Sequence, residues 1–204
     1  MWLLTIKFVS DLKKKIMQYF DDQKYDKQDY TIQPLPAGNY ENCHFSNCNF
    51  NEVDLARINF TDCVFDDCNL SMVNLVETQL NDVRFNNCKI LGVKFEYCNP
   101  NLFRVGFNGC TLNHSTFYQM RMKKTLFRNC QLQEVDFTET ILYEAVFDQC
   151  DLTGAAFSYT QLQKANFSTA FNFTIDPETN QLKKAVFSQQ NLAGLLSKYD
   201  LEII

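Results

Sequence analysis

The stretch that decides the fold is FNGCTLNHSTFYQMRMKKTLFRNCQLQEVDF, residues 107–137. A large apolar residue stands at every fifth position of it: Phe107, Leu112, Phe117, Met122, Phe127, Leu132 and Phe137. Five residues turn an α-helix by about 500°, so these side chains would scatter around a helix. On a flat strand they would alternate between the two faces. The chain must therefore bend once in every five residues to keep each large side chain pointing inward.

Phenylalanine also recurs over a longer distance, in steps of 20 residues with a single step of 22 between Phe85 and Phe107. The members of this column are Phe45, Phe65, Phe85, Phe107, Phe127, Phe147, Phe167 and Phe187. Four bends make one 20-residue coil with four short sides, and a fixed period means that such coils stack into a solenoid. Seven steps of about 4.8 Å predict a rod roughly 34 Å long.

A small or β-branched residue precedes each large one by two positions, as in ANF at Ala165 to Phe167, VDF at Val135 to Phe137 and VDL at Val53 to Leu55. This pattern resembles the pentapeptide-repeat family over roughly residues 38–169. The resemblance implies an all-β fold, a right-handed quadrilateral β-helix, here with short terminal helices. The chain is similar to the quinolone-resistance branch in its length, its cysteine-rich repeats and its apolar C-terminus.

The chain divides into five segments. Residues 1–20 have helical apolar spacing and several lysines, which predicts an amphipathic helix that caps the rod or lies on a membrane, or else a translated extension. Residues 21–37 predict a degenerate first coil, and residues 38–170 the regular β-helix. Residues 171–187 indicate an irregular coil or a hairpin. Residues 188–204 predict a short helix at about 189–198 and a strand at 199–204.

The nine cysteines all fall at the small inward position of the repeat. Thiols stacked about 4.8 Å apart are too distant for a disulfide and do not converge on a metal, so buried packing is expected. An odd count of unpaired cysteines favours a reducing cytoplasm. The two histidines, His44 and His114, are expected to face outward and have no nucleophile placed beside them by a catalytic motif. We therefore expect that the protein is not an enzyme and that it binds no cofactor and no metal.

Charge is uneven along the chain although the net charge is only −5. Residues 38–99 carry nine acidic and four basic residues, a net of −5, whereas residues 100–170 carry six of each. The expected acidic partner-binding surface consists of Glu41, Asp62, Asp66, Asp67 and Asp82. Its expected continuation carries Arg104, Arg121, Lys123, Lys124 and Arg128. The overall acidity argues against direct nucleic-acid binding.

Two functions compete on these grounds. The resemblance implies a DNA mimic that binds a type II topoisomerase, DNA gyrase or topoisomerase IV, and protects it from quinolones or related toxins. The alternative is a protein–protein scaffold with another partner, because a fold does not fix a function. A membrane-surface role of residues 1–20 is a third, weaker hypothesis. The sequence contains no uncharged apolar run of 18 residues, so we expect no membrane-spanning helix.

The apolar tail has two possible uses, as a cap on the last coil or as a two-fold dimer contact. Family members that act on gyrase are commonly dimers through this end, and the resemblance favours a homodimer. The expected dimer contacts are Leu192, Leu195, Leu196, Leu201 and Ile203.

Overall fold

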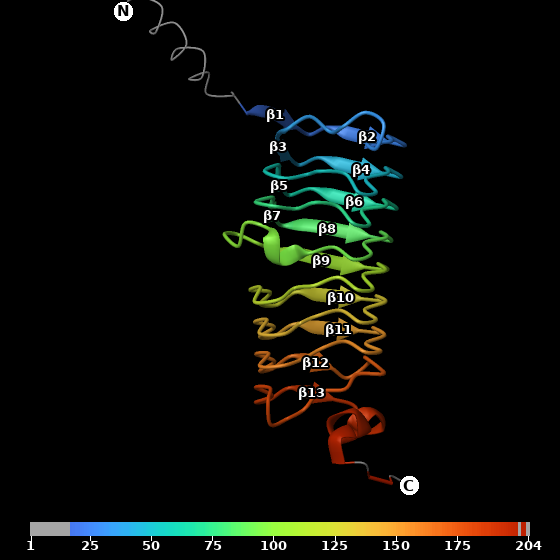
Figure 1. The fold of residues 1–204 in the computed structure, drawn as a ribbon, viewed down its shortest axis with the longest axis vertical. Helices are drawn as coiled ribbons and strands as arrows, with labels where there is room; N and C mark the ends of the chain where they lie inside the picture. Colours follow the sequence, from blue (N-terminus) through green and yellow to red (C-terminus); the bar gives the residue numbers. More distant parts are fainter. Residues whose placement is uncertain (1–16, 200, 203–204) are drawn as a thin grey trace, which may run out of the picture.

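The chain folds into a rod of stacked four-sided coils in a computed structural model that describes residues 17–199 and 201–202 (Figure 1). Every strand pairing is parallel, between residues about 20 apart. The strands form a four-stranded sheet, in the order β1-β3-β5-β7, and a nine-stranded sheet, in the order β13-β12-β11-β10-β9-β8-β6-β4-β2. The predicted right-handed quadrilateral β-helix is confirmed.

The strands are only two to four residues long because a corner follows each of them. Their bounds are β1 Gln18–Asp21, β2 Lys24–Asp26, β3 Gly38–Glu41, β4 His44–Ser46, β5 Asn59–Thr61, β6 Val64–Asp66, β7 Gln79–Asn81, β8 Val83–Asn86, β9 Val105–Asn108, β10 Leu126–Arg128, β11 Val146–Asp148, β12 Asn166–Phe167 and β13 Val186–Phe187. Three 3₁₀-helices complete the described elements: η1 Phe95–Tyr97, η2 Gln189–Leu195 and η3 Ser197–Tyr199. The other two sides of each coil pair through isolated parallel bridges.

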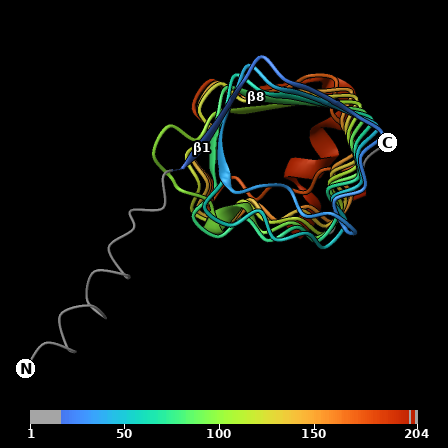
Figure 2. The same ribbon diagram turned by 90° about the horizontal axis from the view of Figure 1, so that it is seen from above.

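The corners explain the period of five. The residue two positions after nearly every large inward side chain has a left-handed backbone, as at Asn47, Glu52, Arg57 and Asp62, where φ lies between 53° and 63°. These four corners close one coil, and the view along the rod in Figure 2 shows the resulting four-sided outline. A non-glycine residue in this conformation costs about 1–2 kcal/mol. Stacking offsets that cost, since Asn47 N–H donates to the carbonyl of Asp66 in the next coil at 2.9 Å.

The interior is a ladder of aromatic rings. Phe45 stacks on Phe65 with centroids 4.7 Å apart, and Phe127 stacks on Phe147 at 5.0 Å. Rings of neighbouring columns meet edge to face, as Phe45 and Phe60 do at 6.0 Å. Offset stacks and edge contacts are the favoured aromatic geometries. The periodic apolar residues of the sequence are therefore the core of the rod.

The cysteines are all free and buried, as the packing interpretation expects. Cys68 Sγ donates to the carbonyls of Phe45 and Asp66, at 3.4 and 3.3 Å. Burial raises the pKa of the Cys63 thiol to about 12. These thiols are small core groups that donate their hydrogen bonds to backbone carbonyl oxygens.

The N-terminal end differs from the sequence-based expectation. The described residues 17–20 of the expected helix are extended, and Gln18–Asp21 forms β1 on the edge of β3. Phe20 stacks on Tyr40 at 4.5 Å, so sheet pairing and ring stacking override the local helical spacing. The first coil therefore starts at β1. The rest of the expected helix lies outside the described residues.

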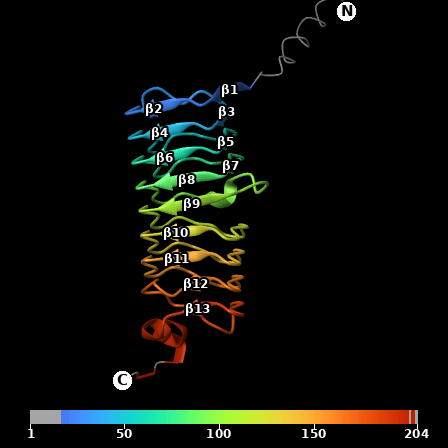
Figure 3. The ribbon, with the colours of Figure 1, turned by 180° about the vertical axis from the view of Figure 1, so that it is seen from behind.

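The structure also shows where the two additional residues of the 22-residue step between Phe85 and Phe107 are accommodated, and how the C-terminal tail folds. The segment 98–104 follows η1 and projects from the rod between the levels of β8 and β9 (Figures 1 and 3). Residues 171–187 continue the coil through parallel bridges of Phe171 with Asp151 and Gln181 with Gln161, so they form no hairpin. The predicted helix at about 189–198 takes the form of two short 3₁₀-helices, η2 and η3. Tyr199 belongs to η3, and residues 201–202 have no regular structure.

Candidate interaction surface

One side of the rod, the β1 face, carries the strongest separation of charge. At its N-terminal end it is the outer surface of the sheet β1-β3-β5-β7. Further along, the bridges of Arg121, Ile141, Gln161 and Gln181 continue it. The pairing of Val83 with Val105 places Arg104 in the corner column between Asp82 and Lys124. The two parts therefore share one edge along the rod.

The five predicted acidic residues fall on two neighbouring faces. Glu41 lies on β3, and Asp62 and Asp82 stand in the corner column that bounds the β1 face. Asp66 lies on β6 in the nine-stranded sheet, and Asp67 occupies the far corner of that face. The β1 face thus holds three of the five, and the adjoining face holds two.

Two further acids extend the array, Asp21 and Asp22, which the sequence analysis left out. Asp21 pairs in register with Glu41, and Asp22 N–H donates to the Glu41 carbonyl at 3.1 Å. The sequence could have indicated both residues, because Asp21 and Asp22 precede Glu41 and Asn42 by 20 residues, the length of one coil. Twelve positions make this acidic half-face, in three columns: Tyr19, Asn39, Asn59, Gln79; Asp21, Glu41, Thr61, Asn81; and Asp22, Asn42, Asp62, Asp82. Five of them are acidic and none is basic, a local charge of −5.

Few contacts neutralise these carboxylates. The Tyr19 hydroxyl donates to Glu41, and that hydrogen bond is the main reason why the pKa of Tyr19 rises to about 12. Arg104 pairs with Asp82, its Nη1 lying 2.8 and 3.1 Å from the two carboxylate oxygens. The side chain of Arg104 is 69% exposed, so the pair is a weak surface interaction. Asp21 and Asp22 form no ion pair with any described residue.

The C-terminal part of the same face has the opposite charge. Twelve equivalent positions make this basic half-face: Arg121, Ile141, Gln161, Gln181; Lys123, Tyr143, Gln163, Lys183; and Lys124, Glu144, Lys164, Lys184. Six are basic and one is acidic, a local charge of +5. The sequence analysis placed Arg121, Lys123 and Lys124 on this surface but missed the three C-terminal lysines, which follow Lys124 by 40 to 60 residues.

Not every basic residue that the sequence analysis assigned to this surface belongs to the basic half-face. Arg128 lies on β10, in the nine-stranded sheet, where its Nε is 3.2 Å from the Asp148 carboxylate. On the same sheet, His44 Nε2 lies 2.5 Å from Asp66 Oδ2, so Asp66 is partly engaged. His114 contacts Glu134 at 3.1 Å on another corner. Both histidines have outward side chains, as expected.

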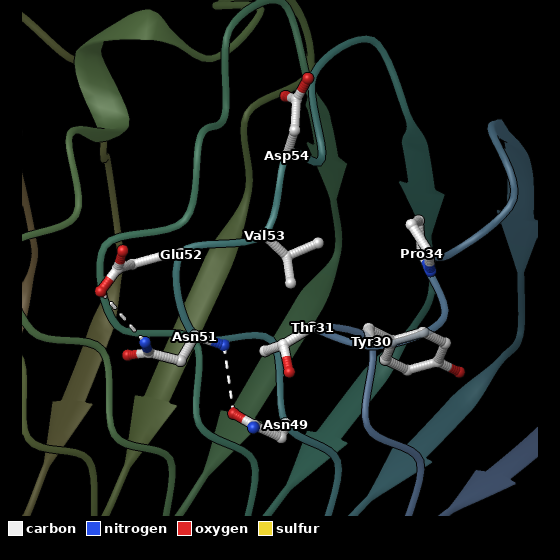
Figure 4. Close-up of a pocket in the computed structure, with 8 residues that line it drawn as sticks. All are labelled: Tyr30, Thr31, Pro34, Asn49, Asn51, Glu52, Val53 and Asp54. Atoms are coloured by element: carbon white, nitrogen blue, oxygen red, sulfur yellow. Dashed lines mark hydrogen bonds between the residues drawn. The ribbon is translucent and has the colours of Figure 1, made fainter.

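A shallow hollow near the N-terminal end has a mixed lining of Tyr30, Thr31, Pro34, Asn49, Asn51, Glu52, Val53 and Asp54 (Figure 4). Asn51 donates to Glu52 at 3.3 Å, and its backbone N–H donates to Asn49 at 3.2 Å. Figure 4 shows the Glu52 and Asp54 carboxylates pointing away from each other. No side chain there is arranged as a nucleophile with its base. Within residues 17–199 and 201–202, no cluster of side chains could hold a metal ion.

The C-terminal end carries an exposed apolar group. The exposed residues are Leu192, Leu196, Tyr199 and Leu201. Leu195 instead packs against the core, and Ile203 lies outside the described residues. The Ile175 N–H donates to the Gly194 carbonyl at 3.0 Å, so η2 caps the last coil. No helix among the described residues is long and apolar enough to cross a membrane.

The comparisons with known proteins agree with this architecture. The family described as pentapeptide repeat region matches residues 39–117 and 100–170, so the chain belongs to the pentapeptide-repeat family. HetL, a pentapeptide repeat protein involved in heterocyst differentiation regulation from the cyanobacterium Nostoc sp. strain PCC 7120, is similar in fold, with 14% identity and a TM-score of 0.59. That alignment covers 90% of this chain and 92% of HetL.

A further solved structure is that of full-length QnrB1, a plasmid-mediated fluoroquinolone resistance protein. It is 16% identical, with a TM-score of 0.44, and the alignment covers 90% of this chain and all of that one. No curated protein matches the chain. At 14% identity the likeness to HetL bears on the fold alone.

Proposed function

We propose that this chain is a non-enzymatic binding protein whose acidic half-face imitates the phosphate backbone of DNA. The partner we propose is a type II topoisomerase, DNA gyrase or topoisomerase IV, which the chain protects against quinolones or related toxins. The choice of this enzyme rests on the resemblance of the chain to the quinolone-resistance branch in its length, its cysteine-rich repeats and its apolar C-terminus. The observation that carries the proposal is the acidic half-face itself, with five carboxylates and no base among its twelve positions.

The spacing of these charges supports imitation of DNA. From Asp22 to Asp82 the chain makes three 20-residue steps, which span about 14 Å at roughly 4.8 Å each. Five carboxylates over this length give about one charge per 3 Å. One strand of duplex DNA presents one phosphate per about 3.4 Å of its axis. A basic surface that binds a DNA strand therefore meets a similar linear charge density here.

A supercoiling assay with purified gyrase and a fluoroquinolone tests this function. Wild-type protein should restore supercoiling in the presence of the drug, and the effect should weaken as salt rises, because the attraction is electrostatic. The variant D22N/E41Q/D62N removes three of the five negative charges of the acidic half-face and should require at least ten times more protein. Its matched control, E52Q/E134Q/E139Q, neutralises three acids elsewhere and should behave as wild type. No effect of wild-type protein at micromolar concentration, on gyrase or topoisomerase IV, would contradict the proposal.

The exposed leucines at the C-terminal end support a homodimer as part of this function. Such a dimer would bury Leu192, Leu196 and Leu201 across a two-fold axis, where the same patch meets itself. Leu195, a predicted contact, is already packed against its own core and would contribute less. Sedimentation of the L192E/L196E variant as a monomer beside a dimeric wild type is the expected result. A monomeric wild type would contradict the dimer but not the acidic surface.

A scaffold for another protein partner is the second candidate. The observation that favours it is the basic half-face, since a cationic surface opposes the DNA-binding surface of a topoisomerase. A partner captured equally by wild type and by D22N/E41Q/D62N, with no effect on either topoisomerase, would support it. Under either function we place the protein in the cytoplasm, because nine unpaired cysteines suit a reducing compartment. The membrane hypothesis concerns residues mostly outside the described part of the chain.

A further inference from the structure

The basic half-face carries six cations that the proposed topoisomerase contact does not use. Its outer columns carry Arg121 on one side and the corner lysines Lys124, Lys164 and Lys184 on the other, with Lys123 and Lys183 between them. All six basic residues are exposed. Three of them lie in the first coil of the array, one in the third and two in the fourth, all on one side of the rod. The array is thus a linear cationic surface about 14 Å long, at roughly 4.8 Å per coil.

Four of the six cations are free. Arg121, Lys123, Lys183 and Lys184 form no ion pair with any residue in the described part of the chain. The other two share Glu144: Lys164 Nζ lies 2.8 Å from one of its oxygens and Lys124 Nζ lies 3.7 Å from the other. Between the cations stand neutral hydrogen-bonding side chains, the glutamines 161, 163 and 181 and Tyr143.

We propose that the basic half-face binds the phosphate backbone of duplex DNA. Phosphates are contacted chiefly by arginine and lysine, with amide and hydroxyl donors completing the contacts, and this is the residue set of the array. Such binding gains free energy from released counterions and needs no apolar centre. The array has almost none, since Ile141 is its only aliphatic residue. This inference is independent of the partner proposed for the acidic half-face.

The net charge of −5 does not oppose this contact. The midpoints of the two half-faces are 102 residues apart, which is five 20-residue coils plus the two-residue insertion, or about 24 Å. The Debye length is about 8 Å at physiological ionic strength, so the acidic half-face is largely screened from a phosphate on the basic one. The local charge of +5 governs binding there.

Other occupants fit less well. Single-stranded nucleic acid needs aromatic platforms for its bases, whereas Tyr143 is the one aromatic residue of the array and Lys164 Nζ already covers its ring at 5.1 Å. A second copy, pairing its acidic half-face with this basic one, would have to form its contact from exposed ion pairs, which are individually weak.

Fluorescence anisotropy with a labelled 20-base-pair duplex of arbitrary sequence tests the proposal, using the full chain between 50 and 200 mM salt. Four free cations predict a slope of log K against log[salt] near −3.6, and a loss of affinity of about 150-fold across this range. The variant K123Q/K183Q/K184Q leaves one free cation, so its slope should fall to about −0.9. The matched control K24Q/K27Q/K89Q removes three exposed lysines from other faces and should keep the wild-type slope.

A variant that binds DNA more tightly shows a direct contact, because a variant that failed to fold would bind more weakly. Glu144→Gln frees Lys124 and Lys164, so we expect DNA binding to strengthen at least threefold and its salt slope to steepen. Absence of wild-type binding at 50 mM salt would overturn the proposal, as would equal losses in the two lysine variants. Salt-dependent self-association without DNA binding, abolished by K123Q/K183Q/K184Q, would also overturn it and assign the face to a second copy.

Discussion

Replacing Phe127 by alanine tests whether the stacked rings hold the rod together. Phe127 is fully buried, and its ring stacks between Phe107 at 5.3 Å and Phe147 at 5.0 Å. The edges of Phe117 and Phe137 complete its surroundings, at 6.1 and 5.8 Å. Truncating a buried phenylalanine costs about 3–5 kcal/mol. Two stacked partners, each worth about 0.5–1.5 kcal/mol beyond burial, place Phe127→Ala at the upper end of that range, about 5 kcal/mol.

The same substitution elsewhere provides the comparison. Phe187, at the end of the column, is half-buried and stacks on one side only, on Phe167 at 5.2 Å, so Phe187→Ala should cost about half as much. Phe171 is 39% exposed, and Phe171→Ala should cost less than about 1 kcal/mol. Urea denaturation followed by circular dichroism measures all three free energies of unfolding. Equal losses for Phe127 and Phe187 would refute the ladder as the main source of stability.

Three further predictions concern the thiols and the C-terminal cap. A thiol reagent should label none of the nine cysteines in the native protein and all nine in urea, because every thiol is buried in the core and out of reach of the reagent; rapid native labelling would contradict this packing. Gly194→Ala should destabilise the cap by about 1–3 kcal/mol in urea denaturation, because its Cβ would lie 2.2 Å from the Phe173 carbonyl oxygen; an unchanged midpoint would contradict the close approach. Lys198 lowers the pKa of Asp176 and of Glu178, so its stabilisation is present above pH 5 and is lost as the pH falls through the folded-state pKa values. The Lys198→Met variant should therefore melt below wild type at pH 7 but together with it near pH 2, and an equal difference at both values would exclude the ion pairs as its cause.

The repeating part of the fold was predictable because one rule acts at every fifth residue. Phe45 stacks on Phe65 and Phe127 stacks on Phe147, as the 20-residue period predicts. The cysteines are buried, as their small side chains at the inward position indicated. The ends were not predictable in this way. Leu4, Phe8 and Phe20 share helical spacing, yet Phe20 belongs to β1, because an open sheet edge on β3 offers hydrogen bonds and a ring partner. Local periodicity cannot report such a distant partner.

The charged surfaces were predictable only in part. Glu41, Asp62 and Asp82 were assigned to one surface from their spacing. Asp21 was missed because its coil looked degenerate, although the backbone there is in register with Glu41. Lys184 was missed because the regular motif ends before it. A charge column can be followed only where the coil is known to continue, and that depends on hydrogen bonds between coils, which leave no mark on the side-chain pattern.

The most direct test of the central claim is a competition between this protein and DNA for purified gyrase or topoisomerase IV. Labelled protein carrying K123Q/K183Q/K184Q, which avoids DNA binding by the basic half-face, would be bound to the enzyme and challenged with short duplex DNA at increasing salt. The account predicts displacement by DNA, weaker binding as salt rises, and binding at least ten times weaker once D22N/E41Q/D62N is added. Binding that is insensitive to DNA, or unchanged in that variant, would contradict imitation of DNA by the acidic half-face.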